Sequence, residues 1–315
     1  MRKLRLKIRE IIICKSAFKP YKMSSVSTSS TALEKSFSSA IDNDQFDGNL
    51  HNYEFVISTV QSSAFRTLIE ALKEILNDVN IEIDSTGMKI LAMDNHQVAL
   101  VHMRLHAKYF ERFYCPKQRV CGVSMSHLFK LLKIMSQNDV LTFYIEKANP
   151  NVLNIQIETN ERSLRHTFEM KLMDIVTERI DVKDTDFKSV IRLVSSEFQK
   201  LCRDMYLLSD HIEIKSCSNQ LIFTVHNDWV SQETVVSESK SNGGMQYIQN
   251  GSPDEVIQGI FSLKYLVLFT KCTGMCKTME IYLKNDYPII LRYYVANLGE
   301  IKFCLSPRTK EDDFN

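Results

Sequence analysis

SSEFQKLCRDM, residues 195–205, has the pattern of a short amphipathic helix, and the chain contains this pattern four times. Its apolar residues recur with the spacing of one helix face, i, i+3, i+4 and i+7: Phe198, Leu201, Cys202 and Met205. Lys200 and Arg203 lie three positions apart, so they are neighbours on the polar face. A serine at the start, Ser195 or Ser196, is placed to cap the first backbone N–H groups.

The other three copies are residues 62–75, 124–135 and 261–271, each with a serine near its start and cations beside its apolar stripe. Their starts are roughly 63 to 70 residues apart, a regular period typical of internal repeats. Between them lie alternating apolar and polar stretches, such as VNIEIDS and LIFTVHN, which predict strands. We therefore expect an α+β chain of two similar domains, each made of two strand-helix-meander repeats. Antiparallel sheets should lie outside, with the short helices on one face.

The charge of this 315-residue chain is unevenly distributed, although its net value is only +1. Residues 1–23 carry +7, residues 24–50 carry −3, and the remainder carries about −3. An acidic body does not bind DNA through its overall charge, so any DNA contact depends on locally arranged cations. The basic arm is compatible with a nuclear address, an organelle presequence, a DNA-binding arm or a disordered tail. A flexible Ser/Thr-rich linker follows it.

The sequence contains no phosphate-cradling GxxxxGK[ST] loop and no GxSxG nucleophile turn, so we expect no enzyme. Eight cysteines follow no secreted-framework spacing, which indicates reduced thiols. Cys272 and Cys276 lack a second ligand pair, and His102 and His106 lack a carboxylate or thiol partner. We therefore expect no metal, no cofactor and surface histidines. No apolar run is long enough to cross a membrane.

GMKILAMDNHQVALVHMRLHAKYF, residues 87–110, resembles the signature of the sliding clamps of eukaryotic and archaeal type, the proliferating cell nuclear antigen family. The Met93–Asp94 pair, the alternating VALVHMRL stretch and Phe110 match this signature, whereas the three residues after Asp94 depart from it. The resemblance continues through FEMKLMD, SSEFQKLCRDM, FTK and residues 288–308, so it covers nearly all of 52–308. It implies the DNA-clamp fold.

The resemblance further implies that three chains close head to tail into a ring whose hole is lined by the short helices. Cationic helix faces would attract the phosphates of duplex DNA without reading its bases. The hole-lining cations of the family fall on Arg66, Lys73, Lys130, Lys133, Lys200, Arg203, Lys264 and Lys271. Thr67 stands where another lysine is usual.

A hydrophobic pocket for short partner peptides with aromatic anchors is also implied, beneath the segment that joins the two domains. The matching positions are Met93, Val98, Leu100, Ile180, Val182, Pro288, Ser306, Pro307 and Arg308. Lys183 stands where a proline is usual and Cys304 where an aromatic residue is usual, so we expect a modified motif preference. Ser218 takes the place of the family's modifiable lysine.

Subunit contacts in such a ring would pair strand edges of neighbouring chains. The matching edges are expected around residues 165–170 and 224–230, with interface residues Arg165, Phe168, Met170, Thr224 and His226. Trp229 is expected either beside this edge or in packing within the chain.

We accordingly divide the chain into an extension (1–50), a first clamp domain (51–171), a connecting segment (172–188), a second clamp domain (189–308) and a tail (309–315). The implied function is a homotrimeric DNA sliding clamp, a processivity factor that tethers DNA polymerase, clamp loader, nuclease and ligase type proteins. The alternatives are a subunit of a heterotrimeric checkpoint clamp, a non-ring viral-type processivity factor, or a scaffold that no longer encircles DNA. The expected location is the nucleus, or a viral replication site in the cytoplasm.

Overall fold

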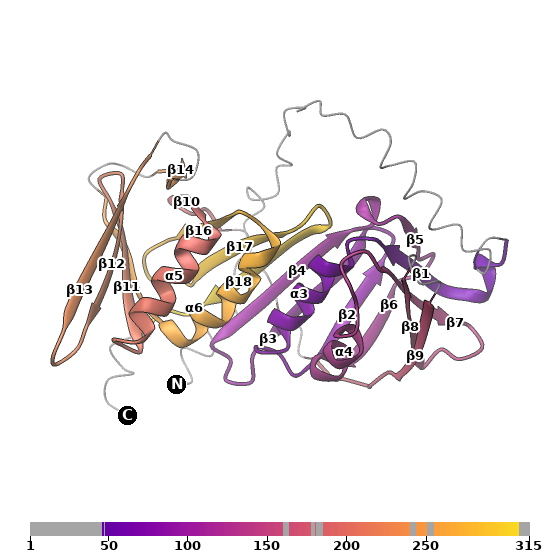
Figure 1. Ribbon diagram of the computed structural model, residues 1–315. Helices are drawn as coiled ribbons and strands as arrows, with labels where there is room; N and C mark the ends of the chain where they lie inside the picture. Colours follow the sequence, from indigo (N-terminus) through magenta and orange to yellow (C-terminus); the bar gives the residue numbers. More distant parts are fainter. Residues whose placement is uncertain are drawn as a thin grey trace.

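The computed structural model describes residue 46 and residues 48–159, 164–177, 180, 185–239, 244–250 and 255–308. Two like halves lie side by side in an elongated molecule (Figure 1). The first half comprises η2 (Leu50–Asn52), β1 (Tyr53–Thr59), α3 (Ser62–Leu72), β2 (Asp78–Asp84), β3 (Gly87–Met93), β4 (Ala99–His106), η3 (Ala107–Tyr109), β5 (Arg112–Tyr114), β6 (Arg119–Ser124), α4 (Met125–Leu132), β7 (Val140–Glu146), β8 (Val152–Thr159) and β9 (Leu164–Lys171). The second half comprises β10 (Ser189–Val194), α5 (Ser195–Tyr206), β11 (His211–Cys217), β12 (Gln220–His226), β13 (Ser231–Ser237), β14 (Gln246–Gln249), β15 (Ile257–Ser262), α6 (Leu263–Phe269), η5 (Thr270–Met275), β16 (Thr278–Leu283), β17 (Ile289–Val295) and β18 (Gly299–Leu305).

The predicted repeat occurs twice in each half of the molecule. A strand runs into a short helix and is followed by three consecutive strands, first as β1-α3-β2-β3-β4 and then as β6-α4-β7-β8-β9. The second half repeats this order as β10-α5-β11-β12-β13 and β15-α6-β16-β17-β18. The predicted fold class of two similar domains, each with two strand-helix-meander units, is confirmed.

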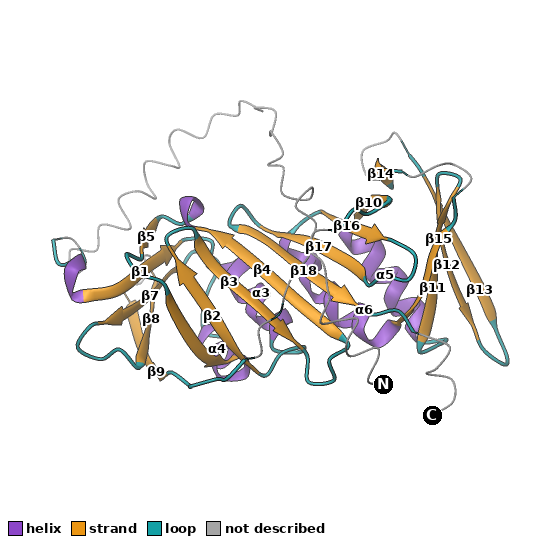
Figure 2. Cartoon of the chain, turned by 180° about the vertical axis from the view of Figure 1, so that it is seen from behind, coloured by secondary structure: helices purple, strands orange, loops and turns teal. Residues whose placement is uncertain are grey.

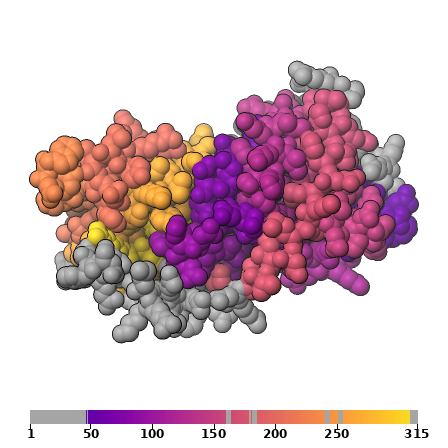
Figure 3. Space-filling view, turned by 90° about the horizontal axis from the view of Figure 1, so that it is seen from below, coloured from indigo at the N-terminus to yellow at the C-terminus, as the bar shows by residue number. Residues whose placement is uncertain are grey.

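The strands of the described residues form three antiparallel sheets. Their strand orders are β5-β1-β7-β8-β9, β14-β10-β16-β17-β18-β4-β3-β2-β6 and β13-β12-β11-β15. The nine-stranded sheet joins the two halves, because β18 of the second half pairs with β4 of the first, from Gly299 opposite Leu105 to Leu305 opposite Ala99. The two halves therefore share one hydrogen-bonded sheet and make one continuous body, which is also visible in the space-filling view (Figure 3).

The helices cover one side of the sheets, and the opposite side of the sheets faces outward, as the view from behind shows (Figure 2). Strand alternation separates these two sides. In β4, Val101 and Met103 enter the main core beneath the helices, whereas Leu100 belongs to a separate apolar cluster on the outward side. The helices form a row in which α4 packs beside α3, α3 beside η5, and α6 beside α5.

The predicted serine caps are absent from the four helices. None of them has a side-chain capping bond, and Ser195 is already the first residue of α5, with its hydroxyl 3.9 Å from the sulfur of Cys276. The reason is that α4, α5 and α6 continue directly from a strand, so a neighbouring backbone carbonyl takes the first helical N–H. Met125, Ser195 and Leu263 donate to Asn77, Lys277 and Asp210 at 2.8, 2.9 and 2.9 Å.

The predicted extension, residues 1–50, lies mostly outside the described residues, but Phe46 is fully buried. Its ring packs edge to face against Tyr53 and Tyr144 on the outward side of the five-stranded sheet, with centroids 5.3 and 5.2 Å away. Arg112 lies over the same ring at 5.7 Å. Packing on the first half therefore begins some residues before the predicted boundary at residue 51.

Candidate functional site

The eight predicted DNA-contacting cations all lie on the helix row or at the ends of its helices, away from the core. Six of them are exposed: Lys130, Lys133, Lys200, Arg203, Lys264 and Lys271. The first five of these form no ion pair with another described residue. These five side chains are therefore exposed at α4, α5 and α6 or the ends of these helices, and the helices lie together on one side of the sheets (Figure 1).

Three of the eight cations are engaged within the chain at the middle of the row. The guanidinium of Arg66 donates to the backbone carbonyl of Met135 at 2.7 Å, which ties α3 to the end of α4. The carboxylate of Glu74 forms ion pairs with Lys73 at 2.7 Å and with Lys271 at 3.2 Å. It therefore links the first half to η5 of the second half. The hydrogen bond from Lys73 is the main cause that lowers the pKa of Glu74, although burial opposes it. The carboxylate offsets part of the positive charge there.

The outward side of the nine-stranded sheet carries a continuous apolar row directly opposite the helices. Cross-strand pairing aligns one residue from each of six strands: Met93, Leu100, Cys304, Ile290, Tyr282 and Val190. Leu91, Ile180 and Phe187 pack against this row, and the Phe187 ring meets Tyr282 edge to face at 5.6 Å. Ile180 and Phe187 come from the predicted connecting segment, so these two described residues of the segment lie against the row.

The structure brings some of the predicted pocket residues together and separates others. Met93, Leu100 and Ile180 meet in the apolar row, whereas Val98 is half-buried against the main core. Ser306 is buried, Pro288 and Pro307 are half-buried, and Arg308 is exposed beyond the end of β18. Val182 and Lys183 lie outside the described residues.

Three members of the row were not predicted from the sequence, Val190, Tyr282 and Ile290, and neither was Phe187, which packs against it. The alternation of MEIYL and IILRYYV was the available signal, because it places Tyr282 and Ile290 on one side of their strands. Which side faces outward depends on the pairing with β18 and β10, and a single strand does not reveal this.

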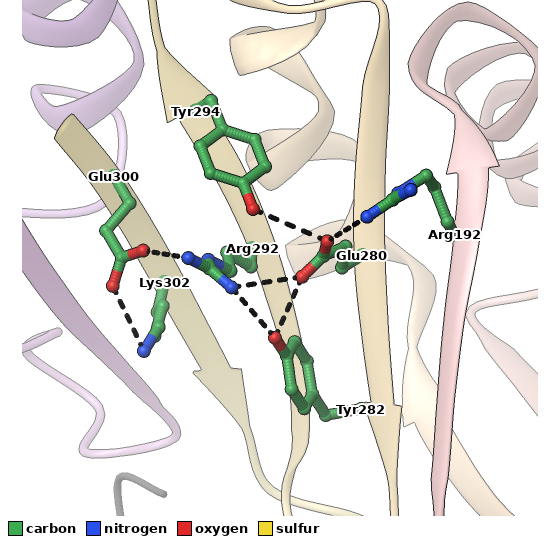
Figure 4. A network of polar contacts seen from close by, with 7 residues as sticks. All are labelled: Arg192, Glu280, Tyr282, Arg292, Tyr294, Glu300 and Lys302. Carbon is green, nitrogen blue, oxygen red and sulfur yellow. Dashed lines mark hydrogen bonds and ion pairs between the residues drawn. The ribbon is translucent and has the colours of Figure 1, made fainter. Parts of the chain in front are cut away.

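A polar network lies beside the apolar row on the same side of the sheet (Figure 4). Its members are Arg192, Glu280, Tyr282, Arg292, Tyr294, Glu300 and Lys302. The carboxylate of Glu280 accepts hydrogen bonds from the guanidinium groups of Arg192 and Arg292, both at 3.1 Å, and from the hydroxyl of Tyr282 at 2.8 Å. Glu300 accepts a hydrogen bond from Arg292 and forms an ion pair with Lys302, whose nitrogen lies 3.1 Å from the carboxylate. The network fixes the hydroxyl of Tyr282, whose ring is part of the apolar row.

The charges of this network stabilise one another despite their burial. Lys302 is only 2% exposed, and burial would raise the pKa of Glu300, but Lys302 and Arg292 hold it below its usual value. Burial likewise lowers the pKa of Lys302, against the attraction of Glu300. Removing one member would leave a partner charge buried without compensation, which is far more costly than losing an exposed ion pair.

The expected edge strands are only partly where the sequence predicted them. β9 is the last strand of the five-stranded sheet, so Arg165, Phe168 and Met170 do lie on an edge. The expectation for Thr224 and His226 is wrong, because β12 pairs with β11 on one side and β13 on the other. The edge of the four-stranded sheet is β13, Ser231–Ser237.

Trp229 lies at the start of this edge and is 73% exposed, so it is not an intrachain packing residue. The side chain of Asn227 organises its loop, because the carboxamide oxygen accepts the N–H groups of Trp229 and Val230 at 3.1 and 2.9 Å. The amide of Asn227 also donates to the carbonyl of Leu208 at the end of α5. An exposed tryptophan therefore stands next to an unpaired strand edge.

In the described part of the chain, no three His, Cys, Asp or Glu side chains are grouped so as to hold a metal ion. The seven cysteines there are free thiols. None of the described helices has the length and apolar character needed to span a bilayer.

Two repeated halves that share one sheet, with the helices on one side and strand edges at β9 and β13, have the DNA-clamp fold. The family models for the proliferating cell nuclear antigen match residues 55–179 (N-terminal domain) and 181–308 (C-terminal domain). A curated relative is the probable DNA polymerase sliding clamp 1 of Paramecium bursaria Chlorella virus 1, which is 36% identical over 260 residues. That match covers 81% of this chain and 97% of the viral protein. The chain belongs to the proliferating cell nuclear antigen family, as its sequence signature predicted.

Proposed function

We propose that the chain is a DNA sliding clamp, a ring-forming processivity factor that encircles duplex DNA and tethers a DNA polymerase and other replication or repair enzymes. The observation that carries this proposal is the single row of four helices, one from each repeat, with cations on its solvent side. A body that is otherwise acidic has its exposed helix cations gathered where a duplex would pass. The family assignment supports the same function.

Contact with DNA in this proposal is electrostatic and independent of base sequence. Lysine and arginine side chains attract phosphates by neutralising charge and releasing counterions, and such contacts carry no sequence information. Because the ring is linked topologically to the duplex, individual contacts can be weak and short-lived. This suits the long, exposed side chains of Lys130, Lys200 and Lys264.

The proposed ring is a homotrimer in which β9 of one chain pairs with β13 of the next. Both strands have one unpaired side, and such edges are templates for pairing with another strand. A head-to-tail interface that closes by rotation gives a cyclic assembly. Ser231–Ser237 replaces Thr224 and His226 as the proposed contact on the second half, while Arg165, Phe168 and Met170 remain the contact on the first.

The apolar row against which Ile180 and Phe187 pack is the proposed site for short peptides of partner proteins, of the polymerase, clamp loader, nuclease and ligase types. Aromatic anchors bury large apolar surfaces and usually carry most of the affinity in such a site. Cys304 leaves a smaller side chain in the row than an aromatic residue would, while Tyr282 and Phe187 supply rings farther along it. A modified motif preference therefore remains our proposal.

The proposed role requires no catalytic residue, metal or cofactor in this chain, because a clamp acts by holding other proteins on DNA. Its place of action is the nucleus or, for a viral chain, a viral replication site in the cytoplasm.

The mass of the full chain in solution, measured by light scattering on a sizing column, tests this function first. A mass of about 110 kDa, three times the 36.5 kDa of one chain, is expected for the closed ring. A loading assay on nicked circular DNA then tests encirclement, because a topologically linked ring stays on the circle and leaves when the circle is cut. A single-chain mass would contradict the homotrimer and favour a subunit of a mixed ring or a non-ring processivity factor.

A further inference from the structure

Asp94 is a buried carboxylate in the turn between β3 and β4, and four hydrogen bonds converge on it. One oxygen accepts the backbone N–H groups of Val98 and Ala99, both at 2.7 Å. The other accepts the N–H of His96 at 3.2 Å and the hydroxyl of Tyr265 at 2.6 Å. Three of these donors belong to the same turn, but Tyr265 lies on α6 in the other half of the molecule.

The turn depends on this carboxylate because its backbone is tightly reversed. Gln97 has a φ of +58°, a left-handed conformation that costs energy for a residue with a side chain. Only two backbone bonds close the turn, from Asp94 to the carbonyl of Ala99 at 2.9 Å and from Gln97 to the carbonyl of Asp94 at 3.0 Å. Charge-assisted bonds to the carboxylate are stronger than neutral ones, so they hold the reversal in place.

Tyr265 is well placed to serve as a permanent donor to this carboxylate. Its own burial, followed by the hydrogen bond to Asp94, raises its pKa above the ordinary value, so the hydroxyl keeps its proton at all physiological pH values. The ring lies beside Phe269 on the same helix, at 6.3 Å, and Phe269 stacks on Phe303 of β18 at 4.6 Å. The position of the hydroxyl is therefore set by the packing of α6 on the sheet.

The same turn carries one wall of the proposed peptide site. Met93 comes immediately before Asp94 and packs against the apolar row, and Leu100 shortly after the turn is part of the row. The carbonyl of Val98 accepts the N–H of Ser306 at 3.2 Å, at the exit of β18. A displacement of the turn would thus move Met93 and Leu100 and break the bond that holds Ser306 at the end of β18.

We infer that Tyr265 is a positioning residue for partner binding, because its hydroxyl in the second half fixes the turn in the first half that joins Met93 to Leu100 of the apolar row. This inference rests on the proposed peptide site. It adds that the site takes its shape only when α6 is docked against the turn, so a residue on a helix that faces DNA controls the pocket on the outward side of the sheet.

The test compares the wild-type chain with Tyr265→Phe, which removes the hydroxyl and keeps the ring. The probe is a fluorescein-labelled synthetic peptide with two adjacent aromatic anchors, titrated by fluorescence anisotropy. Loss of one bond to a buried carboxylate is expected to weaken peptide binding about tenfold. Amide hydrogen exchange at Val98 and Ala99 should become faster, while the mass in solution and binding to duplex DNA stay unchanged.

Tyr206→Phe is the matched control, because Tyr206 is an exposed tyrosine on α5 that makes no hydrogen bond with the described residues. It should leave both peptide affinity and the exchange of the turn unaltered. Equal peptide affinity of wild type and Tyr265→Phe would overturn this inference and leave the proposed function standing. If the wild-type chain failed to bind any such peptide, the proposed site itself would be overturned, and this inference with it.

Discussion

His102 illustrates how the environment of a single side chain differs from what the sequence suggests. A surface histidine was predicted, but His102 is largely enclosed on β4, opposite Lys302 of β18 and Leu91 of β3. Burial is the main cause that lowers its pKa to about 4, and the positive charge of Lys302 adds to it. Arg104 on the same strand and Lys89 on β3 act in the same direction, and only Glu300 opposes them. The imidazole is therefore neutral at physiological pH.

This lowered pKa predicts a stability change in mild acid. The ordinary histidine pKa is 6.5, so between pH 6.5 and about 4 the unfolded chain binds a proton that the folded chain rejects. The contribution of the neutral His102 to the free energy of unfolding is thus fully present above pH 6.5, and it is lost as the pH is lowered through this window. Between pH 7 and pH 4.5 the free energy of unfolding of the wild-type chain should fall by roughly 2 kcal/mol more than that of His102→Gln. Urea unfolding at equal chain concentration measures both.

The difference between the two chains is the meaningful quantity in this experiment, because the partly buried His106 also has a lowered pKa and contributes to both curves. Glu300 and Glu74, whose pKa values are lowered, add further loss only below their ordinary value of 4.5. Parallel pH profiles for wild type and His102→Gln would contradict the buried, neutral histidine.

Strands and helices were more predictable than the order in which the strands pair. The i, i+3, i+4, i+7 stripe of 195–205 predicts α5 well, because helix geometry alone brings Phe198, Cys202 and Met205 onto one face, and this face is buried in the core. In contrast, 220–226 and 231–237 alternate equally well, and nothing within either stretch says which is the edge. The Glu280–Arg292–Glu300 network and the Asp94–Tyr265 bond escaped prediction for the same reason. Each depends on residues brought together by pairing or docking of distant elements.

The position of β13 at a sheet edge predicts that a charge there disrupts the proposed ring. Val235 is 46% exposed on β13, and lysine on an edge strand opposes pairing with another strand because its charge would have to be desolvated. Val235→Lys should shift the mass in solution from that of three chains toward 36.5 kDa. Light scattering over a dilution series provides the measurement.

Ile260→Lys is the matched control for this substitution. Ile260 is 43% exposed on β15, at the opposite edge of the same four-stranded sheet, and the backbone N–H of Arg308 already bonds to its carbonyl at 2.7 Å. The control should keep the mass of the wild type. If both variants behave alike, β13 is not the subunit contact.

Positive and negative charges are unevenly distributed over the chain. Its net charge of +1 hides a basic N-terminal arm and an acidic body, and the exposed cations of α4, α5, α6 and η5 are concentrated on the helix side of that body. The repeat explains this arrangement, since each repeat supplies one helix with the same orientation relative to its sheet. One residue pattern used four times thereby makes a surface that no single helix provides.

This distribution predicts that position, not number, determines the effect of lysines on DNA binding. The triple variant Lys130→Glu, Lys200→Glu and Lys264→Glu reverses three exposed lysines, one each on α4, α5 and α6, none of which forms an ion pair with another described residue. Binding to a linear duplex, which a ring can enter from the ends, should weaken by about tenfold or more at low salt. The slope of log K against log salt should also decrease, by roughly 0.9 for each phosphate that the variant no longer neutralises.

A second triple variant, Lys108→Glu, Lys117→Glu and Lys188→Glu, makes the same change in net charge at exposed positions outside the four helices. Because long-range attraction depends on net charge while phosphate contacts depend on position, this control should weaken binding only slightly and keep the salt slope. The solution masses of both variants should match that of the wild type, since none of the six lysines lies on β9 or β13. If the two variants weaken DNA binding equally, the attraction comes from net charge, and the helix row is not the surface that meets the duplex.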